Sequence, residues 1–209
     1  MTPDRTKLGS RARTRYPRGE MRLRRARGFS LIEMMMSVGI LAIIASVAIP
    51  QFIRYQLKVK TAEARQMIGG IIHTQESFAA EYENYANIAT PNPTGAPGIV
   101  KRSWQVVECP GQCSRTNPTA CTSFECIGFQ PPSQVFYSYA SVHRLAGPGR
   151  PPEYAVGASA DLDGDSNIGS YAYRSSNYGG PVGVLADGTS TCPANIPSVI
   201  VENCSVVSF

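Results

Sequence analysis

The sequence predicts an α+β fold in which a long N-terminal helix packs on an antiparallel sheet. Three observations predict it. Residues 29–86 carry apolar side chains at helical spacing, short β-like segments separated by turn residues follow, and all six cysteines lie in the second half of the chain. With 209 residues, 43% of them hydrophobic and 17% charged, the chain can form one globular domain with extensions.

Residues 1–28 form a basic leader. They contain ten Lys or Arg and two acidic residues and show no apolar periodicity, so we expect them to stay in the cytoplasm without folding. Met21 opens the stretch MRLRRARG and is an alternative translation start. The remaining 181 residues hold ten basic and thirteen acidic side chains, so the net charge of +5 gives no indication of nucleic-acid binding.

Residues 29–50 can cross a membrane. The stretch FSLIEMMMSVGILAIIASVAI holds a single charged residue, Glu33. As a helix it would extend about 32 Å, close to the thickness of the hydrocarbon core of a bilayer. The arginines before it predict a cytoplasmic N-terminus and an exported remainder. Pro50 ends the apolar stretch and predicts a bend in the helix.

Residues 51–86 predict an amphipathic continuation of the helix, in which Gly69 and Gly70 form a weak point that permits a bend. Residues 87–209 predict a β-rich head outside the cytoplasm, beginning with the loop sequence TPNPTGAPG. The β-like segments are residues 103–108, 134–142, 153–159 and 170–176.

The apolar segment has two simple interpretations that leave Glu33 unexplained. A secretory signal peptide would be cut after ASVA, which ends at Ala48, but the apolar stretch is longer than such a peptide needs and helix continues beyond it. A plain single-span anchor explains the length and the basic flank. In both interpretations, a carboxylate in hydrocarbon costs free energy and has no role that would offset this cost.

A third interpretation comes from a family resemblance. The segment RGFSLIEMMMSVGILAIIASVAIPQF resembles the N-terminus of type IV prepilins and of their relatives, the type II secretion pseudopilins. The family pattern has a glycine before the cut, a phenylalanine after it, a glutamate at the fifth mature position and a proline at the twenty-second. Gly28, Phe29, Glu33 and Pro50 match it. The resemblance rests on specific residues as far as about residue 55, and beyond residue 86 it concerns only the expected arrangement of helix and sheet.

This resemblance implies a structural subunit that polymerises through its N-terminal helix. A prepilin peptidase would cut between Gly28 and Phe29 on the cytoplasmic side and methylate the new amine of Phe29. An inner-membrane assembly platform would then add the subunit to a helical filament on the cell surface, where Glu33 of one copy faces the Phe29 amine of its neighbour and sets the register. The filament would serve twitching motility, adhesion or DNA uptake. The alternatives are a pseudopilin of a type II secretion system and a membrane-anchored or secreted binding domain.

The cysteines fit disulfides in an exported domain. A zinc site is the competing interpretation, but the spacings are not C-x2-C and no histidine is near. Four cysteines allow three pairings, which the sequence does not choose between: Cys109, Cys113, Cys121 and Cys126. Cys192 and Cys204 resemble the disulfide that closes the C-terminal loop of pilins, so the expected fold includes a disulfide-bonded C-terminal loop.

One acidic loop is a weak candidate for calcium. The segment ADLDGDSN places four oxygen-bearing side chains together: Asp161, Asp163, Asp165 and Asn167. It is not an EF-hand, because position 172 is Ala where a bidentate Glu is needed. A polar turn between strands is the simpler interpretation. We expect no other cofactor.

No arrangement of residues indicates catalysis. His73 lies in the predicted helix and His143 follows a predicted strand, and neither has a Cys or Asp at a spacing that would suggest nucleophilic chemistry. The sequence therefore predicts a protein that is not an enzyme.

Overall fold

The structure is a computed structural model that describes residues 28–95, 98–175 and 202–203. The predictions on the leader and on Cys192 and Cys204 lie outside these residues. The chain divides into two compact units, Met1–Ala45 and Ser46–Phe209. The described part of the first unit is the beginning of the N-terminal helix, and the second unit holds the head.

Helix α1 extends over Leu31–Tyr82. Ser30 caps it, since its Oγ accepts a hydrogen bond from the backbone N–H of Glu33 at 3.4 Å, the Ser-x-x-Glu pattern of a capping box. The helix includes Pro50 and the Gly69–Gly70 pair. It ends four residues before the predicted limit because Glu83 adopts a left-handed conformation, with φ of 57°, which stops the helix.

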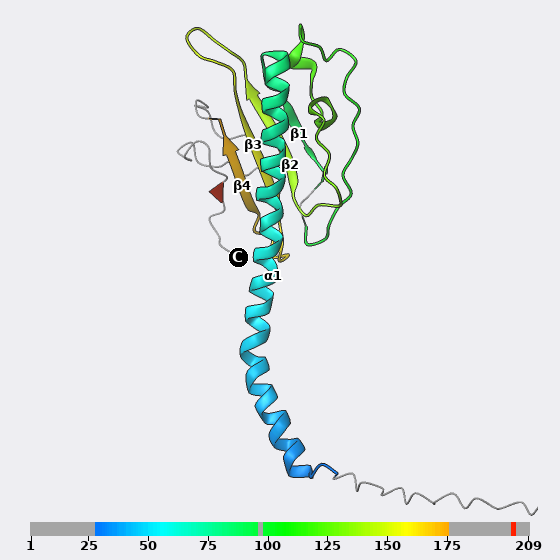
Figure 1. Ribbon diagram of the computed structural model, residues 1–209, viewed down its shortest axis with the longest axis vertical. Coiled ribbons are helices and arrows are strands. Elements are labelled where there is room, and N and C mark those ends of the chain that lie inside the picture. The colour runs from blue at the N-terminus through cyan, green and yellow to red at the C-terminus, as the bar shows by residue number, and fades with distance from the viewer. Residues whose placement is uncertain (1–27, 96–97, 176–201, 204–209) are drawn as a thin grey trace, which may run out of the picture. The chain divides into compact units, whose positions relative to one another are not determined.

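Within the described residues, the sheet has five antiparallel strands in the order β1-β2-β3-β4-β5 (Figure 1). Their bounds are Ile88–Asn92 for β1, Ser138–Arg144 for β2, Glu153–Ala160 for β3, Gly169–Arg174 for β4 and Glu202–Asn203 for β5. Three predicted strands correspond to β2, β3 and β4. The α+β class predicted from the sequence is therefore confirmed.

The prediction of a fourth strand at residues 103–108 is wrong. That segment forms no strand: the neighbouring Arg102 makes an isolated bridge with Val135 outside the named strands, and Val106 and Val107 are exposed. The true first strand, β1, lies at the edge of the sheet, in part of the segment predicted as a loop. Pro91 is tolerated in it, because a strand edge that pairs with no other strand does not need the N–H that proline lacks.

Between Glu63 and Tyr82, α1 lies on one face of the sheet (Figure 1). The buried helical residues recur every three or four positions: Ala64, Met67, Ile68, Ile71, Gln75 and Phe78. The apolar ones share one core with Tyr139, Tyr154 and Val156 of the strands. Gln75 is fully buried, and its Nε2 donates to Ser141 Oγ of β2 at 2.8 Å and to the Ala86 carbonyl at 3.1 Å. The helix and the sheet are thus joined by polar bonds as well as apolar contacts.

The connection between β1 and β2 carries two nested disulfides, Cys109–Cys126 and Cys113–Cys121. It also holds two 3-10 helices, η1 (Pro118–Ala120) and η2 (Phe124–Ile127). The structure thereby chooses one of the three pairings that the sequence left open. Because all four sulfurs are in disulfides, the zinc interpretation is wrong for these cysteines.

Candidate functional site

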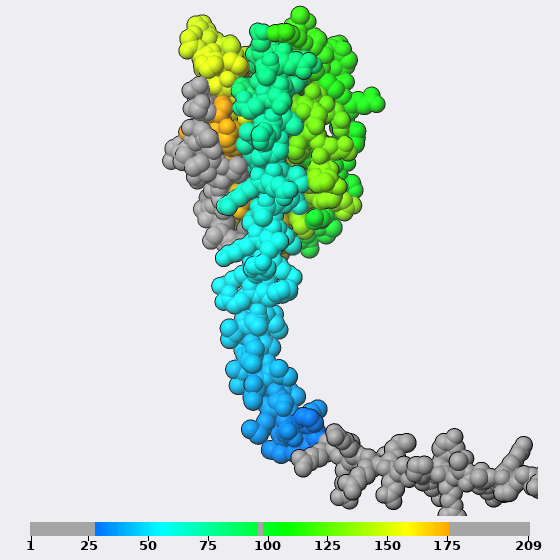
Figure 2. Space-filling model, viewed as in Figure 1, coloured from blue at the N-terminus to red at the C-terminus, as the bar shows by residue number. Residues whose placement is uncertain are grey.

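The apolar half of α1 is uncovered. Its large side chains are exposed, among them Leu31 at 81%, and Phe29 just before the helix is 70% exposed. Among the described residues, α1 is the helix that is long and apolar enough to cross a membrane, and none of its most apolar 18-residue window is buried. Figure 2 draws the first turns of α1 in blue. A surface of this kind requires lipid or other protein around it.

The residues of the proposed cleavage and pairing site lie at the start of this helix. Gly28, Phe29 and Ser30 precede its first turn, and Glu33 lies in that turn. The carboxylate of Glu33 contacts no partner within residues 28–95, 98–175 and 202–203. An acidic side chain in the first turn also interacts favourably with the helix dipole. Cleavage, methylation and pairing at these residues stay predictions.

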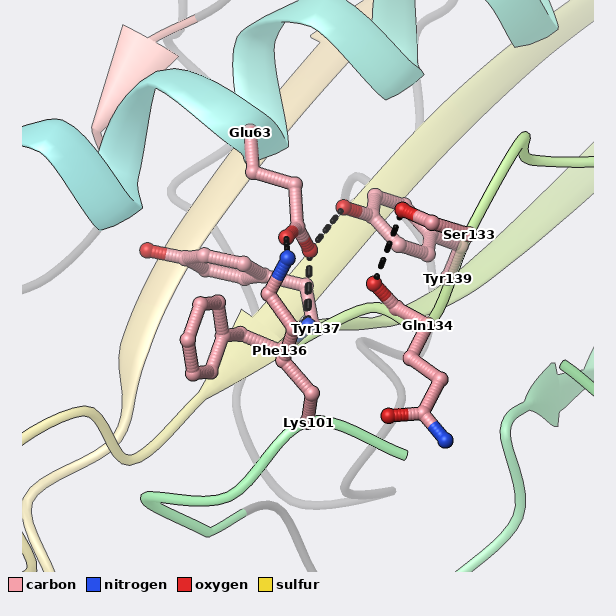
Figure 3. A network of polar contacts seen from close by, with 7 residues as sticks. All are labelled: Glu63, Lys101, Ser133, Gln134, Phe136, Tyr137 and Tyr139. Carbon is pink, nitrogen blue, oxygen red and sulfur yellow. Dashed lines mark hydrogen bonds and ion pairs between the residues drawn. The ribbon is translucent and has the colours of Figure 1, made fainter. Parts of the chain in front are cut away.

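A second glutamate, Glu63, joins α1 to the sheet (Figure 3). Its Oε1 accepts hydrogen bonds from the Phe136 N–H at 2.7 Å, and from the Tyr137 N–H and the Tyr139 hydroxyl at 3.4 Å each. Lys101 Nζ lies 3.9 Å from Oε2. Burial raises the pKa of Tyr139 well above its usual value, and the neighbouring Glu63 adds to that rise. The helical spacing of residues 51–86 does not by itself indicate this role of Glu63.

A third helical glutamate, Glu76, accepts hydrogen bonds from two tyrosines. Tyr154 Oη donates to it at 2.9 Å and Tyr85 Oη at 3.3 Å. Burial, followed by the charge of Glu76, raises the pKa of Tyr85 to about 12. Glu63 and Glu76 therefore hold the sheet at two levels, thirteen residues or about 20 Å apart along the helix.

One member of the glycine pair in α1, Gly70, allows close packing against the helix. A Cβ on Gly70 would lie 2.9 Å from Phe129 Cε2, whereas a Cβ on Gly69 would meet nothing within 4 Å. Phe129 is buried and lies edge-on to Trp104, with ring centroids 5.7 Å apart. Gly70 thus lets the β1–β2 connection approach the helix axis, a role that the sequence did not indicate.

The acidic loop connects β3 to β4. Carboxylate oxygens of Asp161, Asp163 and Asp165 lie within 4.8 Å of one another. Asp161 accepts the N–H groups of Gly164 at 2.7 Å and Ser166 at 3.2 Å, which are turn-forming bonds. Asp165 accepts the backbone and side-chain N–H groups of Asn167, and these bonds lower its pKa. Calcium binding by these residues stays a prediction.

The two histidines lie apart from these contacts. His73 is exposed on α1, and His143 lies on β2, where burial lowers its pKa. Neither forms a cluster with Cys, Asp or Glu that could hold a metal ion in the described part of the chain.

A comparison with known protein families finds a match for the N-terminal segment of the chain. Residues 23–49 match the family model of the prokaryotic N-terminal methylation motif. The match includes the start of the exposed apolar helix α1, which precedes the α+β head.

The similar curated proteins include one major pilin and two fimbrial proteins. The chain is 36% identical over 109 residues to the type IV major pilin protein PilA of Myxococcus xanthus (strain DK1622), covering 49% of each chain. It is 34% identical over 68 residues to two fimbrial proteins of Pseudomonas aeruginosa, covering 32% of this chain and 44% of theirs. The chain thus spans about half the length of the curated relatives it matches. No solved structure matches it.

Proposed function

We propose that the chain is a structural subunit of a type IV pilus. The observation that carries the proposal is the methylation motif at residues 23–49, which includes the start of an apolar helix whose most apolar 18-residue window has no buried residue. The names of the relatives, a major pilin and two fimbrial proteins, support a structural rather than an enzymatic role.

The first step is processing at the membrane. The basic leader keeps the N-terminus in the cytoplasm, and the helix from Phe29 spans the inner membrane. Prepilin peptidase cuts between Gly28 and Phe29 and methylates the new α-amine. Gly28 is exposed and has no side chain to obstruct the cut. Removal of the leader leaves Glu33 as the one charged side chain between Phe29 and Pro50.

The second step is assembly. A membrane-embedded carboxylate is costly unless it finds a cation or a proton. In a bundle of N-terminal helices, Glu33 of one subunit pairs with the Phe29 amine of the next. This pairing offsets the free-energy cost of placing each charge in an apolar environment. The platform in the inner membrane lifts each subunit into a filament, in which the apolar halves form the core and the heads face outward on the cell surface.

Processing is tested on protein extracted from membranes. Intact-mass measurement and N-terminal sequencing should give a mature chain that begins at methylated Phe29. The same chain from cells without prepilin peptidase should keep its leader. A mature chain that begins at Ile49 would instead identify a secretory signal peptide, and an uncut chain in normal cells would identify a plain anchor.

A pseudopilin shares the same motif, so deletion of the gene distinguishes the two functions. Loss of surface filaments and twitching supports the pilus, whereas loss of enzyme secretion with filaments intact supports a type II secretion role. A membrane-anchored or secreted binding domain would change neither.

A further inference from the structure

The head contains a small pocket on the outer side of β1. It has a volume of about 150 Å³ and lies between β1 and the disulfide-bonded connection that follows it. Residues 88–94 form one wall and residues 105–107 and 122–124 form the other. The six side chains used below are Ile88, Thr90, Gln105, Val107, Thr122 and Phe124.

Both ends of the pocket are fixed by hydrogen bonds between its walls. At one end, the Asn87 N–H donates to the Cys121 carbonyl at 3.1 Å. At the other, Asn92 Nδ2 donates to the Gln105 carbonyl at 2.6 Å, and the Gln105 N–H donates to Asn92 Oδ1 at 3.0 Å. Because hydrogen bonds join the two walls at both ends, the fold itself fixes the distance between the walls.

The disulfides hold the second wall in place. Cys121, which is bonded to Cys113, directly precedes Thr122, and Cys126, bonded to Cys109, lies two residues after Phe124. A wall held in this way loses little conformational freedom when a ligand enters, so more of the contact energy contributes to affinity.

The lining has no charged residue, but it is rich in hydroxyl and amide groups. Thr90 Oγ1, Thr122 Oγ1 and Gln105 Nε2 make no hydrogen bond to any other residue that the structure describes. Ile88, Val107 and Phe124 add apolar surface. A charged ligand would find no opposite charge in this lining, and an apolar ligand would cover the polar groups without pairing them.

We propose that this pocket binds one neutral sugar residue of a glycan. A sugar ring offers several hydroxyls to Thr90, Thr122 and Gln105 and an apolar C–H face to Val107. The volume of about 150 Å³ is below the range of pockets for drug-sized ligands, which limits the occupant to a single ring. The inference goes beyond the pilus proposal and uses residues of the head alone, so it is tested without polymerisation.

The test uses the intrinsic fluorescence of Trp104. It is the single tryptophan of the chain, it precedes Gln105, and its ring centroid lies 5.0 Å from that of Phe124. The full chain is purified in a detergent without a sugar headgroup and titrated with methyl glycosides of glucose, galactose, mannose and N-acetylglucosamine. Glucuronate and glucosamine are the charged comparators.

We expect a saturable fluorescence change with at least one neutral glycoside, with a dissociation constant on the order of 1 mM, and none with the charged sugars. Thr122→Val removes one hydroxyl, and Val107→Phe fills the mouth of the pocket. Each should weaken binding at least about tenfold. Thr116→Val is the matched control, because Thr116 lies in the same connection but bonds to Ser114 away from the pocket.

Three results would overturn the proposal. One is the absence of a saturable response to every neutral glycoside, and another is equally tight binding of a charged sugar. The third is unchanged binding by Thr122→Val and Val107→Phe in proteins that melt at the same temperature as the unmodified chain.

Discussion

Glu63 holds more of the molecule together than its single ion pair indicates. Its side chain is 15% exposed, and the carboxylate bonds to a backbone N–H at 2.7 Å and to a tyrosine hydroxyl at 3.4 Å. The contact with Lys101 is longer, at 3.9 Å, and Lys101 is 43% exposed, so solvent screens it. The neutral donors, more than the cation, make this residue important.

Replacement of Glu63 tests this ranking of its contacts. Glu63→Ala leaves the Phe136 N–H without its acceptor beside the core, so the free energy of unfolding should fall by about 2 kcal/mol. Denaturant unfolding of the full chain in detergent, followed by Trp104 fluorescence, measures the change.

Lys101→Met is the matched control and should cost less than about 1 kcal/mol, including its contact with the Phe136 ring. If the lysine variant loses as much stability as the alanine variant, then the ion pair is the dominant contact.

The sequence distinguishes Glu33 from its surroundings but does not distinguish Glu63. Glu33 stands out because it lies in a spanning apolar stretch, where any charge requires a reason. Glu63 lies among alternating charged and apolar residues, and the donors of its hydrogen bonds are 73 to 76 positions away in the chain. Helical spacing assigns a residue to a face, but a long side chain at the edge of that face can turn inward when donors are there.

At the scale of elements, the adjacent glycines Gly69 and Gly70 of α1 have opposite roles. Gly70 is required by contact with Phe129, whereas Gly69 has open space around its Cα. Phe129 is held by Trp104 and by Phe124, at ring-centroid distances of 5.7 Å and 5.8 Å, so it has little room to retreat.

Alanine at each glycine should therefore change stability in opposite directions. Gly69→Ala should raise the free energy of unfolding by about 0.5 to 1 kcal/mol, because alanine restricts the unfolded chain and favours helix. Gly70→Ala should lower it by about 1 to 2 kcal/mol through overpacking. The same fluorescence-detected unfolding measures both.

A double variant separates contact from backbone effects. Phe129→Leu in the Gly70→Ala background should cost less than Phe129→Leu alone, because the smaller side chain relieves the contact. Additive costs would show that Gly70 is needed for another reason.

The strands show where sequence patterns succeed and where they do not. The three β-like segments that correspond to β2, β3 and β4 became strands because each has a strand neighbour on both sides. Residues 103–108 have an equally good local pattern, but the nearby disulfides and the Asn92–Gln105 bonds hold them beside the edge of β1. Long-range partners decide strand identity, and a single sequence does not reveal them.

At the scale of the whole molecule, Glu33 has two possible reasons to be where it is. In the single chain it is the third residue of a capped first turn, where an acid is favourable. In a filament it would pair with the Phe29 amine of a neighbour. The first reason needs only a residue that suits the helix start, whereas the second needs a negative charge.

Glu33→Gln separates these reasons, because glutamine also suits the third position of a capping box but has no charge. We expect normal cleavage of this variant and at least about a tenfold lower yield of sheared filaments, the factor that corresponds to the loss of 1.4 kcal/mol at a contact. Immunoblots of membrane and sheared fractions measure both quantities.

Ser30→Ala is the opposite change, since it removes the cap and keeps the charge. It should leave filament yield within about a factor of two, a loss of under 1 kcal/mol. Normal filaments from Glu33→Gln, or equal losses from both variants, would refute the pairing of Glu33 with the amine.

The nested disulfides have a consequence for proteolysis. Arg115 is exposed, and it lies between Cys113 and Cys121, which in turn lie between Cys109 and Cys126. A protease that cuts after Arg115 therefore opens a ring without releasing a fragment, because the two pieces stay joined by both sulfur bridges. The nicked protein would gain the mass of one water and separate into two bands only on reduction. An exposed filament built from such heads could be nicked at this position without shedding any part of a subunit.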